Sequence, residues 1–242
     1  MQVKTSDDVR QLGTILSVWA HPDDETFCAG GLMAAAITNG QTVICITATK
    51  GEAGVQDEER WPAKELASIR EKELHAALKV LGIKEHHFLA YKDGQCQEAD
   101  VQEAAAQIQA FIKKHQPDTI LTFGPEGLTG HPDHQAISGW VGKAVERASH
   151  QPKVFHAVLT VGQYKKYLSA ADEKLNLFYN IEQPPLESAK DCGICFCCTD
   201  SLCDCKYDAF TAMPSQYTKV QETLSEEYIK EAFRIEAFVE AN

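Results

Sequence analysis

Two kinds of apolar segment alternate over residues 14–161, and this alternation constrains the fold more than any other feature of the sequence. Short runs rich in β-branched residues are each followed by a longer segment whose apolar residues recur at helical spacing. The sequence predicts strands over residues 14–20, 42–48, 87–91, 118–123 and 153–161, and helices over 26–39, 62–81, 99–115 and from Pro132 onward. Strands that alternate with helices form a parallel sheet covered on both faces. The sequence therefore predicts an α/β fold.

The chain is long enough for one domain with a sizeable core, since 44% of its 242 residues are hydrophobic. We expect a single domain over residues 1–242, with a sheet-forming core in about 14–150 and a smaller, less regular C-terminal portion in 151–242. The apolar pattern weakens in this last portion, except for a helix predicted over residues 225–240. Residues 1–13 are largely polar, and we expect them to lie at the surface.

Charge and composition exclude several classes of partner. The 23 basic and 35 acidic residues give a formal net charge of −12, which argues against sequence-independent binding to nucleic acid or to an anionic membrane. The N-terminal segment lacks the pattern of a signal peptide, and no window reaches the roughly 18 apolar residues of a spanning helix. We therefore expect a cytoplasmic protein without nucleic-acid or membrane partners.

The first predicted strand ends in a turn rich in polar groups. His21, Asp23, Asp24 and Glu25 place one imidazole and three carboxylates within five positions. Pro22 lacks an amide hydrogen and favours an extended residue before it, so the strand should end here and present these side chains at the edge of the sheet. Proteins of the α/β class bind ligands at this edge. The alternative interpretation is a capping turn, because Asp commonly begins helices.

The fourth predicted strand leads to a second polar motif. Gly130–His134 reads Gly-His-Pro-Asp-His and precedes a helix, and Pro132 is typical of a first helical turn. His131 and His134 lie three positions apart, so their imidazoles can converge on one point while Asp133 points elsewhere. The carboxyl ends of strands one and four can be neighbours where the strand order of a doubly wound sheet reverses. We therefore expect the two motifs to meet in one crevice.

Histidine and aspartate ligands without thiolates suit a hard-to-borderline divalent cation that keeps open positions for water. Zinc is the expected ion. Bound zinc lowers the pKa of its water toward about 7 and polarises a carbonyl group. Only one of the adjacent carboxylates Asp23 and Asp24 can readily bind the ion in this turn, which leaves the other free to act as a general base.

The two motifs resemble the signature motifs of the LmbE-like, or PIG-L, family of zinc-dependent N-acetylglucosaminyl deacetylases and amidases. Further matches to the family, in the expected order, are Thr49–Gly54, Arg70 with Glu73, and Tyr91 with Asp93 and Gly94. The similarity spans about residues 14–145. It implies a Rossmann-like α/β sandwich, in agreement with the alternation of strands and helices.

The resemblance also implies roles for the residues of the two motifs. His21, Asp24 and His134 would bind Zn²⁺, one ion per chain, although Fe²⁺ or another divalent ion could replace it. Asp23 would be the general base that deprotonates the metal-bound water. His131, protonated, would stabilise the oxyanion and donate a proton to the leaving amine, with Asp133 orienting its ring.

The resemblance extends to substrate contacts, with two departures. Arg70 and Asp93 match positions that hold sugar hydroxyls in the family. Family members often carry a His before Arg-Ser-Gln at the end of a late helix, whereas Ala212–Gln216 of this chain reads Ala-Met-Pro-Ser-Gln. Some members have a tyrosine two residues before the first His of the second motif, where this chain has Thr129. These departures concern the substrate preference more than the chemistry.

The resemblance implies a cytoplasmic zinc hydrolase that removes an acyl group, acetyl above all, from the nitrogen of an N-acetylglucosamine-type sugar or a related amide. Its partner would be this small N-acyl amino sugar, and the apolar C-terminal helix could serve homo-oligomer formation. An amidase acting on a larger thiol-sugar conjugate is the alternative within this class. A non-catalytic metal-binding or nucleotide-sugar-binding module is the alternative from another class, although His21 and its neighbours replace the Gly-x-Gly-x-x-Gly turn that the nucleotide-binding version needs.

Six of the nine cysteines lie between Cys192 and Cys205. Their spacing could serve a second, thiolate-rich metal site or a redox function. The competing interpretation is that residues 194–198 form a strand in which cysteine packs as a small hydrophobic residue. We favour this structural interpretation, because the family usually has a strand and a helix in this region.

Overall fold

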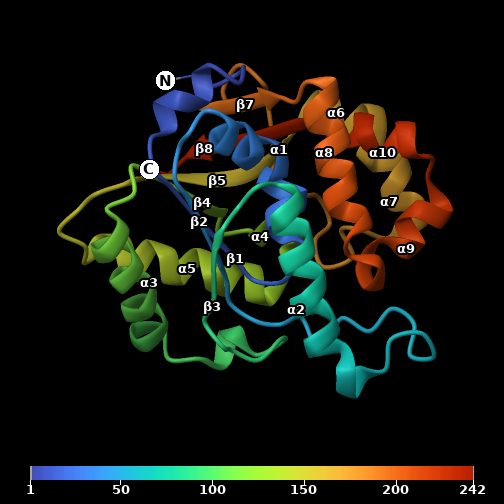
Figure 1. Cartoon of the computed structure of the whole chain (residues 1–242), viewed down its shortest axis with the longest axis horizontal. Helices are drawn as coiled ribbons and strands as arrows, with labels where there is room; N and C mark the ends of the chain where they lie inside the picture. The colour runs from blue at the N-terminus through green and yellow to red at the C-terminus, as the bar shows by residue number, and fades with distance from the viewer. Residues whose placement is uncertain (1, 242) are drawn as a thin grey trace.

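The computed structural model describes residues 2–241, which form one sheet with helices on both faces (Figure 1). The strands are β1 (Ile15–Trp19), β2 (Val43–Thr47), β3 (Glu85–Phe88), β4 (Thr119–Phe123), β5 (Lys153–Thr160), β6 (Leu186–Glu187), β7 (Ile194–Cys197) and β8 (Ile235–Glu240). Their order is β3-β2-β1-β4-β5-β8-β7, and the short β6 pairs with β5. The predicted α/β class with a Rossmann-like, mostly parallel sheet is confirmed.

The parallel part of the sheet brings the two sequence motifs together. β1 pairs in parallel with β2 on one side and with β4 on the other. The chain proceeds outward from β1 through β2 to β3, and in the opposite direction from β4 to β5, so the strand order reverses between β1 and β4. Every residue of β1, β2 and β4 is buried, as expected for strands covered on both faces. The carboxyl ends of β1 and β4 therefore lie side by side at the switch point of the sheet.

Helices cover the sheet from both sides. They are α1 (Asp24–Thr38), α2 (Ala63–Val80), α3 (Val101–His115), α4 (Gly127–Gly130), α5 (Pro132–Glu146), α6 (Val161–Gln163), α7 (Ser169–Leu175), α8 (Asp200–Thr211), α9 (Pro214–Thr223) and α10 (Glu226–Ala232). α3 and α5 pack together on one face, whereas α1, α2 and α8 pack together on the other (Figure 1). Of the helices that the structure describes, none combines the length and the apolar composition needed to cross a bilayer.

The helix predicted over residues 225–240 is wrong in its second half. α10 ends at Ala232, and β8 then pairs antiparallel with both β5 and β7. Glu236, Ala237 and Phe238 are consecutive and all buried, so the strand shows no clean alternation of apolar and polar residues. Residues 235–240 form a strand rather than a helix because they pair with strands on both sides. The sheet therefore continues into the C-terminal portion.

The remaining boundaries differ little from the prediction. Most predicted strands and helices start and end within two residues of the observed ones, while the third strand begins two residues earlier than predicted and ends three residues earlier. The expectation that residues 1–13 lie at the surface is wrong in part, because three apolar side chains of this segment are fully buried, namely Val3, Val9 and Leu12.

A buried ion pair connects β8 to the helix that follows the first motif. Lys206 of α8 and Glu236 of β8 lie 2.6 Å apart, and each residue is 2% exposed. The Glu236 carboxylate accepts hydrogen bonds from the amides of Gly31 and Leu32, and Lys206 donates to the carbonyl of Phe27. These peptide groups lie one turn apart in the middle of α1, so the pair fixes α1 against the C-terminal portion.

Replacement of Glu236 by Gln should destabilise the fold strongly, because it leaves the Lys206 charge buried without a partner. We expect the free energy of unfolding of the Glu236→Gln variant to fall by about 3–5 kcal/mol. In a Lys206→Met/Glu236→Gln double variant the loss should be smaller than the sum of the losses of the two single variants. Urea denaturation measures both quantities. The exposed pair Lys143 and Glu146 provides the control, since Lys143→Met should cost about 0–1 kcal/mol. A loss for Glu236→Gln no larger than this control would contradict the prediction.

Candidate active site

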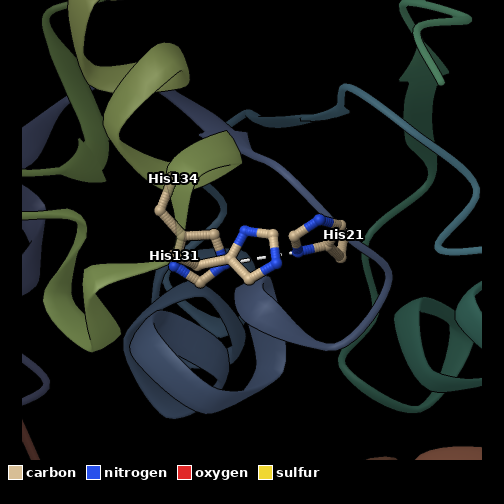
Figure 2. A group of neighbouring side chains, drawn as sticks. All are labelled: His21, His131 and His134. Atoms are coloured by element: carbon tan, nitrogen blue, oxygen red, sulfur yellow. Dashed lines mark hydrogen bonds between the residues drawn. The ribbon is translucent and has the colours of Figure 1, made fainter. Parts of the chain in front are cut away.

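The two sequence motifs meet at the carboxyl ends of β1 and β4. His21 follows β1 and Asp24 begins α1, while His131 precedes α5 and His134 lies in its first turn. Figure 2 shows His21 facing the two histidines of the second motif. One nitrogen from each of the three histidines lies within 4.8 Å of the others. The crevice predicted between the two motifs is therefore present.

Three side chains of the site direct their donor atoms to one point. Nδ1 of His21 lies 3.2 Å from Nε2 of His134. One oxygen of Asp24 lies 3.6 Å from Nδ1 of His21, and the other lies 3.4 Å from Nε2 of His134. Ligand atoms placed at 2.0–2.1 Å from a tetrahedral zinc ion would be separated by about 3.3 Å. The spacing of His21, Asp24 and His134 therefore fits a small divalent cation.

The other ring nitrogens fix the direction of both imidazoles. Nδ1 of His134 donates to the carbonyl of Gly127 over 2.9 Å, which leaves the lone pair on Nε2. Nε2 of His21 lies 3.0 Å from Asp93 and 3.2 Å from Asp133, so the proton belongs on Nε2 and the lone pair on Nδ1. The hydrogen-bond network assigns these tautomers. Two lone pairs and a carboxylate that face one another repel unless a cation lies between them.

The charges around His21 also favour a cation. Burial by itself would lower the pKa of His21, but the carboxylates of Asp133, Asp93 and Asp24 raise it to about 10. Burial lowers the pKa of His134 to about 4, so this ring stays neutral. A site with this much negative charge attracts either a proton or a metal ion. The donor set and its surroundings therefore fit a metal centre.

Asp23 lies beside this group in a strained turn. Its φ angle is 121°, a conformation that residues other than glycine rarely adopt. Glu25 accepts a hydrogen bond from the amide of Asp23 over 3.0 Å, and a guanidinium nitrogen of Arg70 lies 3.2 Å from the Asp23 carboxylate. Burial raises the pKa of Asp23 to about 7 although Arg70 opposes this shift. The turn therefore presents a carboxylate that can take up and release a proton near neutral pH.

His131 and Asp133 depart from the roles predicted for them. The Asp133 carboxylate contacts His21 and accepts hydrogen bonds from the amides of Gly94 and Cys96, so the prediction that it orients the His131 ring is wrong. The backbone amide of Asp133 orients that ring instead, because it donates to Nδ1 of His131 over 3.1 Å. Burial and the charge of His21 lower the pKa of His131, which opposes the predicted protonated form. Neutral His131 still carries one donor, Nε2–H.

Arg70 and Asp93 line the site, but their charged groups already have partners in the protein. Arg70 is 3% exposed and donates to the carbonyls of Gly51 and Pro22. Asp93 accepts a hydrogen bond from the amide of Ala53 and contacts His21. Both residues hold the loops of the site in place, and a sugar hydroxyl would have to share these contacts.

The C-terminal portion contributes residues that motif analysis did not single out. The Oγ and the amide of Ser215 both donate to Glu73 of α2, which fixes the start of α9. Gln216 then reaches the site and donates to the carbonyl of Gly54. Met213, which stands where the family often has its late His, is 1% exposed and packs in the core. The sequence signals for this contact were the match of Glu73 to the family and the Ser-Gln pair at 215–216, which this chain shares with the family's late Arg-Ser-Gln.

Two cavities meet at the group of donor atoms. The polar cavity has a volume of about 320 Å³, and its lining includes His21, Arg70, Asp93, His131 and Gln216. The apolar cavity has a volume of about 430 Å³, and most of its lining side chains are apolar, with α1, α9 and the segment after α7 among the elements that contribute them. Six residues line both cavities at their junction, namely Asp23, Asp24, Gln56, His134, Tyr179 and Gln216.

The cysteine-rich segment does not contribute to this site. Its residues form β7 at the end of the sheet and the first half of α8, and all nine cysteines are free thiols. Within residues 2–241, the groups of three or more closely spaced His, Cys, Asp or Glu ligands are both centred on His21. Cys198 and Cys203 pack in the hydrophobic core. The predicted strand is present, but the predicted core packing holds only for part of the segment, because Cys195 is half-buried and Cys197 is exposed.

Comparison with known proteins identifies relatives of the chain. Residues 16–149, more than half of the chain, match the family described as PIG-L, GlcNAc-PI de-N-acetylase. The 1D-myo-inositol 2-acetamido-2-deoxy-alpha-D-glucopyranoside deacetylase of Mycobacterium sp. (strain KMS) is 34% identical over 168 residues, covering 60% of this chain and 54% of the relative. A Bacillus cereus protein named "Probable N-acetyl-alpha-D-glucosaminyl L-malate deacetylase 2" is 33% identical over 166 residues, covering 67% of this chain and 75% of the relative.

The fold is also found among solved structures. The N,N'-diacetylchitobiose deacetylase from Pyrococcus horikoshii superimposes with a TM-score of 0.60 and 24% identity, covering 96% of this chain and 85% of that chain. At this identity the similarity concerns the fold alone. The chain spans about half the length of the mycobacterial relative, so the activity of that whole protein does not transfer directly.

Replacement of Asp133 by Asn should weaken metal binding although no predicted ligand is removed. The Gly94 and Cys96 amides donate to different oxygens of Asp133, so asparagine keeps an acceptor for only one of them, and it withdraws the charge that holds Nε2 of His21. We expect the zinc affinity to fall about 10- to 100-fold. Equilibrium dialysis at fixed free zinc measures the change, with the exposed Asp57→Asn as the matched control. Equal affinities for the Asp133→Asn and Asp57→Asn variants would refute the role given to Asp133.

Proposed function

The chain belongs to the PIG-L family, and from this premise we propose that it is a metal-dependent deacetylase that hydrolyses the amide of an N-acylated amino sugar. The observation that carries the proposal is the convergence of His21, Asp24 and His134 on one point beside the Asp23 carboxylate. The named relatives are deacetylases of N-acetylglucosaminyl compounds, which supports this substrate class. Because β8 and β7 extend the sheet beyond β5, we treat residues 1–242 as one working domain.

We propose Zn²⁺ as the ion, one per chain, held by His21, Asp24 and His134. Two imidazoles and one carboxylate form a donor set that zinc enzymes use while they keep a further position open. When bound, the ion would polarise the amide carbonyl and make a bound water more acidic. Fe²⁺ accepts the same donors, so metal analysis of the purified protein decides between the two ions.

Asp23 is placed to move the proton of the attacking water. Its carboxylate lies at the junction of the two cavities and is held there by Arg70. From this position it can accept the water proton as the oxygen adds to the amide carbon, and a proton can return to the nitrogen as the C–N bond breaks. Asp24 is not free for this task, since its two oxygens face His21 and His134.

His131 is placed to stabilise the negative charge that develops on the amide oxygen. Its ring lines the polar cavity, with its centroid 4.8 Å from that of His21. The Asp133 amide occupies Nδ1, so Nε2–H points its hydrogen away from the backbone. A donor that is fixed before the reaction costs no reorganisation when the charge appears. His131 therefore acts as a neutral donor in this proposal.

The polar cavity is suited to the sugar. Gln56, Arg70, Asp93 and Gln216 surround it with donors and acceptors, and hydrogen bonds hold the last three in place. A carbohydrate carries hydroxyl groups that need such partners, because an unpaired polar group is costly to bury. We propose that Arg70 and Asp93 contact the sugar by sharing the hydrogen bonds they already make.

Replacement of Asp23 by Asn should abolish most of the deacetylase activity while the metal stays bound. The amide is isosteric with the carboxylate but accepts no proton, so we expect kcat to fall about 10²- to 10⁴-fold. Acetate release from N-acetylglucosamine derivatives and metal content per chain are the two measurements. The Asp24→Asn variant should instead lose the metal.

The control for this experiment is the Cys195→Ser/Cys197→Ser double variant, which should keep both the metal and the activity because these cysteines lie on β7, away from the site. Full activity of Asp23→Asn with metal present would exclude Asp23 as the base. Activity or metal content that followed the cysteines instead would point to a thiolate site.

Replacement of Arg70 by Lys should reduce turnover without loss of the metal. Lysine can neutralise Asp23, but it cannot also donate to the Gly51 and Pro22 carbonyls in the planar arrangement of a guanidinium group. We expect kcat/KM to fall about 10- to 100-fold. Arg60→Lys is the matched control, because Arg60 is exposed on a loop outside both cavities. Equal kcat/KM values for the Arg70→Lys and Arg60→Lys variants would argue against the positioning role.

A further inference from the structure

The apolar cavity is larger than the proposed reaction requires if the acyl group is acetyl. Its volume of about 430 Å³ falls within the range of pockets that bind whole small molecules. Its walls include Phe27, Phe123, Leu128, Leu177, Val220 and Phe233. An acetyl group offers one methyl group to such a space. The cavity therefore has room and chemistry for a larger apolar group.

The junction of the two cavities determines where that group attaches to the substrate. Asp23, Asp24 and His134 line both cavities, so a scissile amide at the metal centre lies between them. One side of the amide must then enter the polar cavity and the other side the apolar one. The amino sugar needs the polar cavity for its hydroxyls, which leaves the apolar cavity for the acyl chain.

Much of the apolar wall comes from outside the part of the chain that matches the family. The match ends at residue 149, whereas Leu177, Val220 and Phe233 lie in the C-terminal portion. Tyr179 stands at the boundary, since it lines both cavities and is 66% exposed. The family comparison therefore indicates the reaction, whereas residues of the C-terminal portion form much of the wall of the cavity that would take the acyl chain.

We infer that the chain hydrolyses amides whose acyl chain is apolar and several carbons longer than acetyl. The inference rests on the proposed function and specifies its substrate. Water adds its oxygen to the amide carbon, the C–N bond breaks, and the nitrogen leaves as the amine after it takes up a proton. The products are the free amino sugar and a carboxylate whose apolar tail occupies the cavity between α1 and α9.

Kinetics with N-acetyl, N-butanoyl, N-hexanoyl and N-octanoyl glucosamine test this inference. Each buried methylene can add up to about fourfold to kcat/KM, so the hexanoyl substrate should exceed the acetyl substrate by at least about tenfold. Val220→Trp fills the cavity from α9, and Leu177→Trp fills it from the segment after α7. In each variant the ratio of hexanoyl to acetyl kcat/KM should fall at least about tenfold.

The control for bulk is Val101→Trp on α3, which is 43% exposed in the wild type and lies outside both cavities. It should leave the hexanoyl-to-acetyl ratio as in the wild type. The inference is overturned if the acetyl substrate is hydrolysed at least as well as the longer ones, or if both filled variants keep the wild-type ratio. It is also overturned if an apolar group on the sugar raises kcat/KM more than one on the acyl side does.

Binding of free carboxylates separates this inference from the proposed function. The purified protein with its metal bound is titrated calorimetrically with acetate, butanoate, hexanoate and octanoate. Affinity should increase with chain length in the wild type and lose that dependence in the two filled variants. If no amide is hydrolysed but this dependence is found, the proposed function fails and the apolar acyl site stands. If hydrolysis occurs and no dependence is found, the acyl site fails and the deacetylase stands.

Discussion

The arrangement of the site depends on the carboxylates that surround the buried imidazole of His21. His21 is contacted by Asp93 from the loop after β3, by Asp133 from the start of α5 and by Asp24 from α1. Three segments that are distant in the sequence are therefore held together through one ring. Such a concentration of negative charge is unstable in a buried place without a compensating cation. The carboxylates that attract the cation also orient the imidazole ring so that Nδ1 faces His134. The same three side chains therefore account for both the negative charge of the site and the direction of this donor atom.

The neighbouring turn shows how strain and charge are combined at the site. Asp23 keeps a positive φ because Glu25 accepts from its amide and Arg70 binds its carboxylate. Strain of this kind persists only where the surroundings enforce it. The turn separates two adjacent aspartates, so that Asp24 faces the imidazoles and Asp23 faces the cavities. Sequence alone could state that only one of them binds the ion, and the contacts of Arg70 and Glu25 support the proposed division of the two roles.

The sequence was informative where the determinants are local and misleading where they are tertiary. The strands of the parallel sheet follow from apolar runs, and the meeting of His21 with His134 follows from the position of β1 beside β4. The role of Asp133 could not be predicted, because its partner depends on how the loop after β3 folds over α5. Residues 235–240 were predicted as helix because Ile235 and Phe238 continue the helical spacing of the apolar residues before them, whereas the strand buries Glu236 beside them. Periodicity does not reveal a partner such as Lys206, which lies on another element.

The two sides of the proposed reaction share one helix. α1 begins with Asp24 at the proposed metal centre, and its next turn contributes Phe27 and Cys28 to the wall of the apolar cavity. Lys206 and Glu236 hold this same turn and the one after it against α8 and β8. A packing change around Phe27 and Cys28 would therefore act on the same helix that presents Asp24, the proposed metal ligand. The buried ion pair limits shifts of this helix, so the C-terminal portion both shapes the apolar cavity and keeps Asp24 in register with His21 and His134.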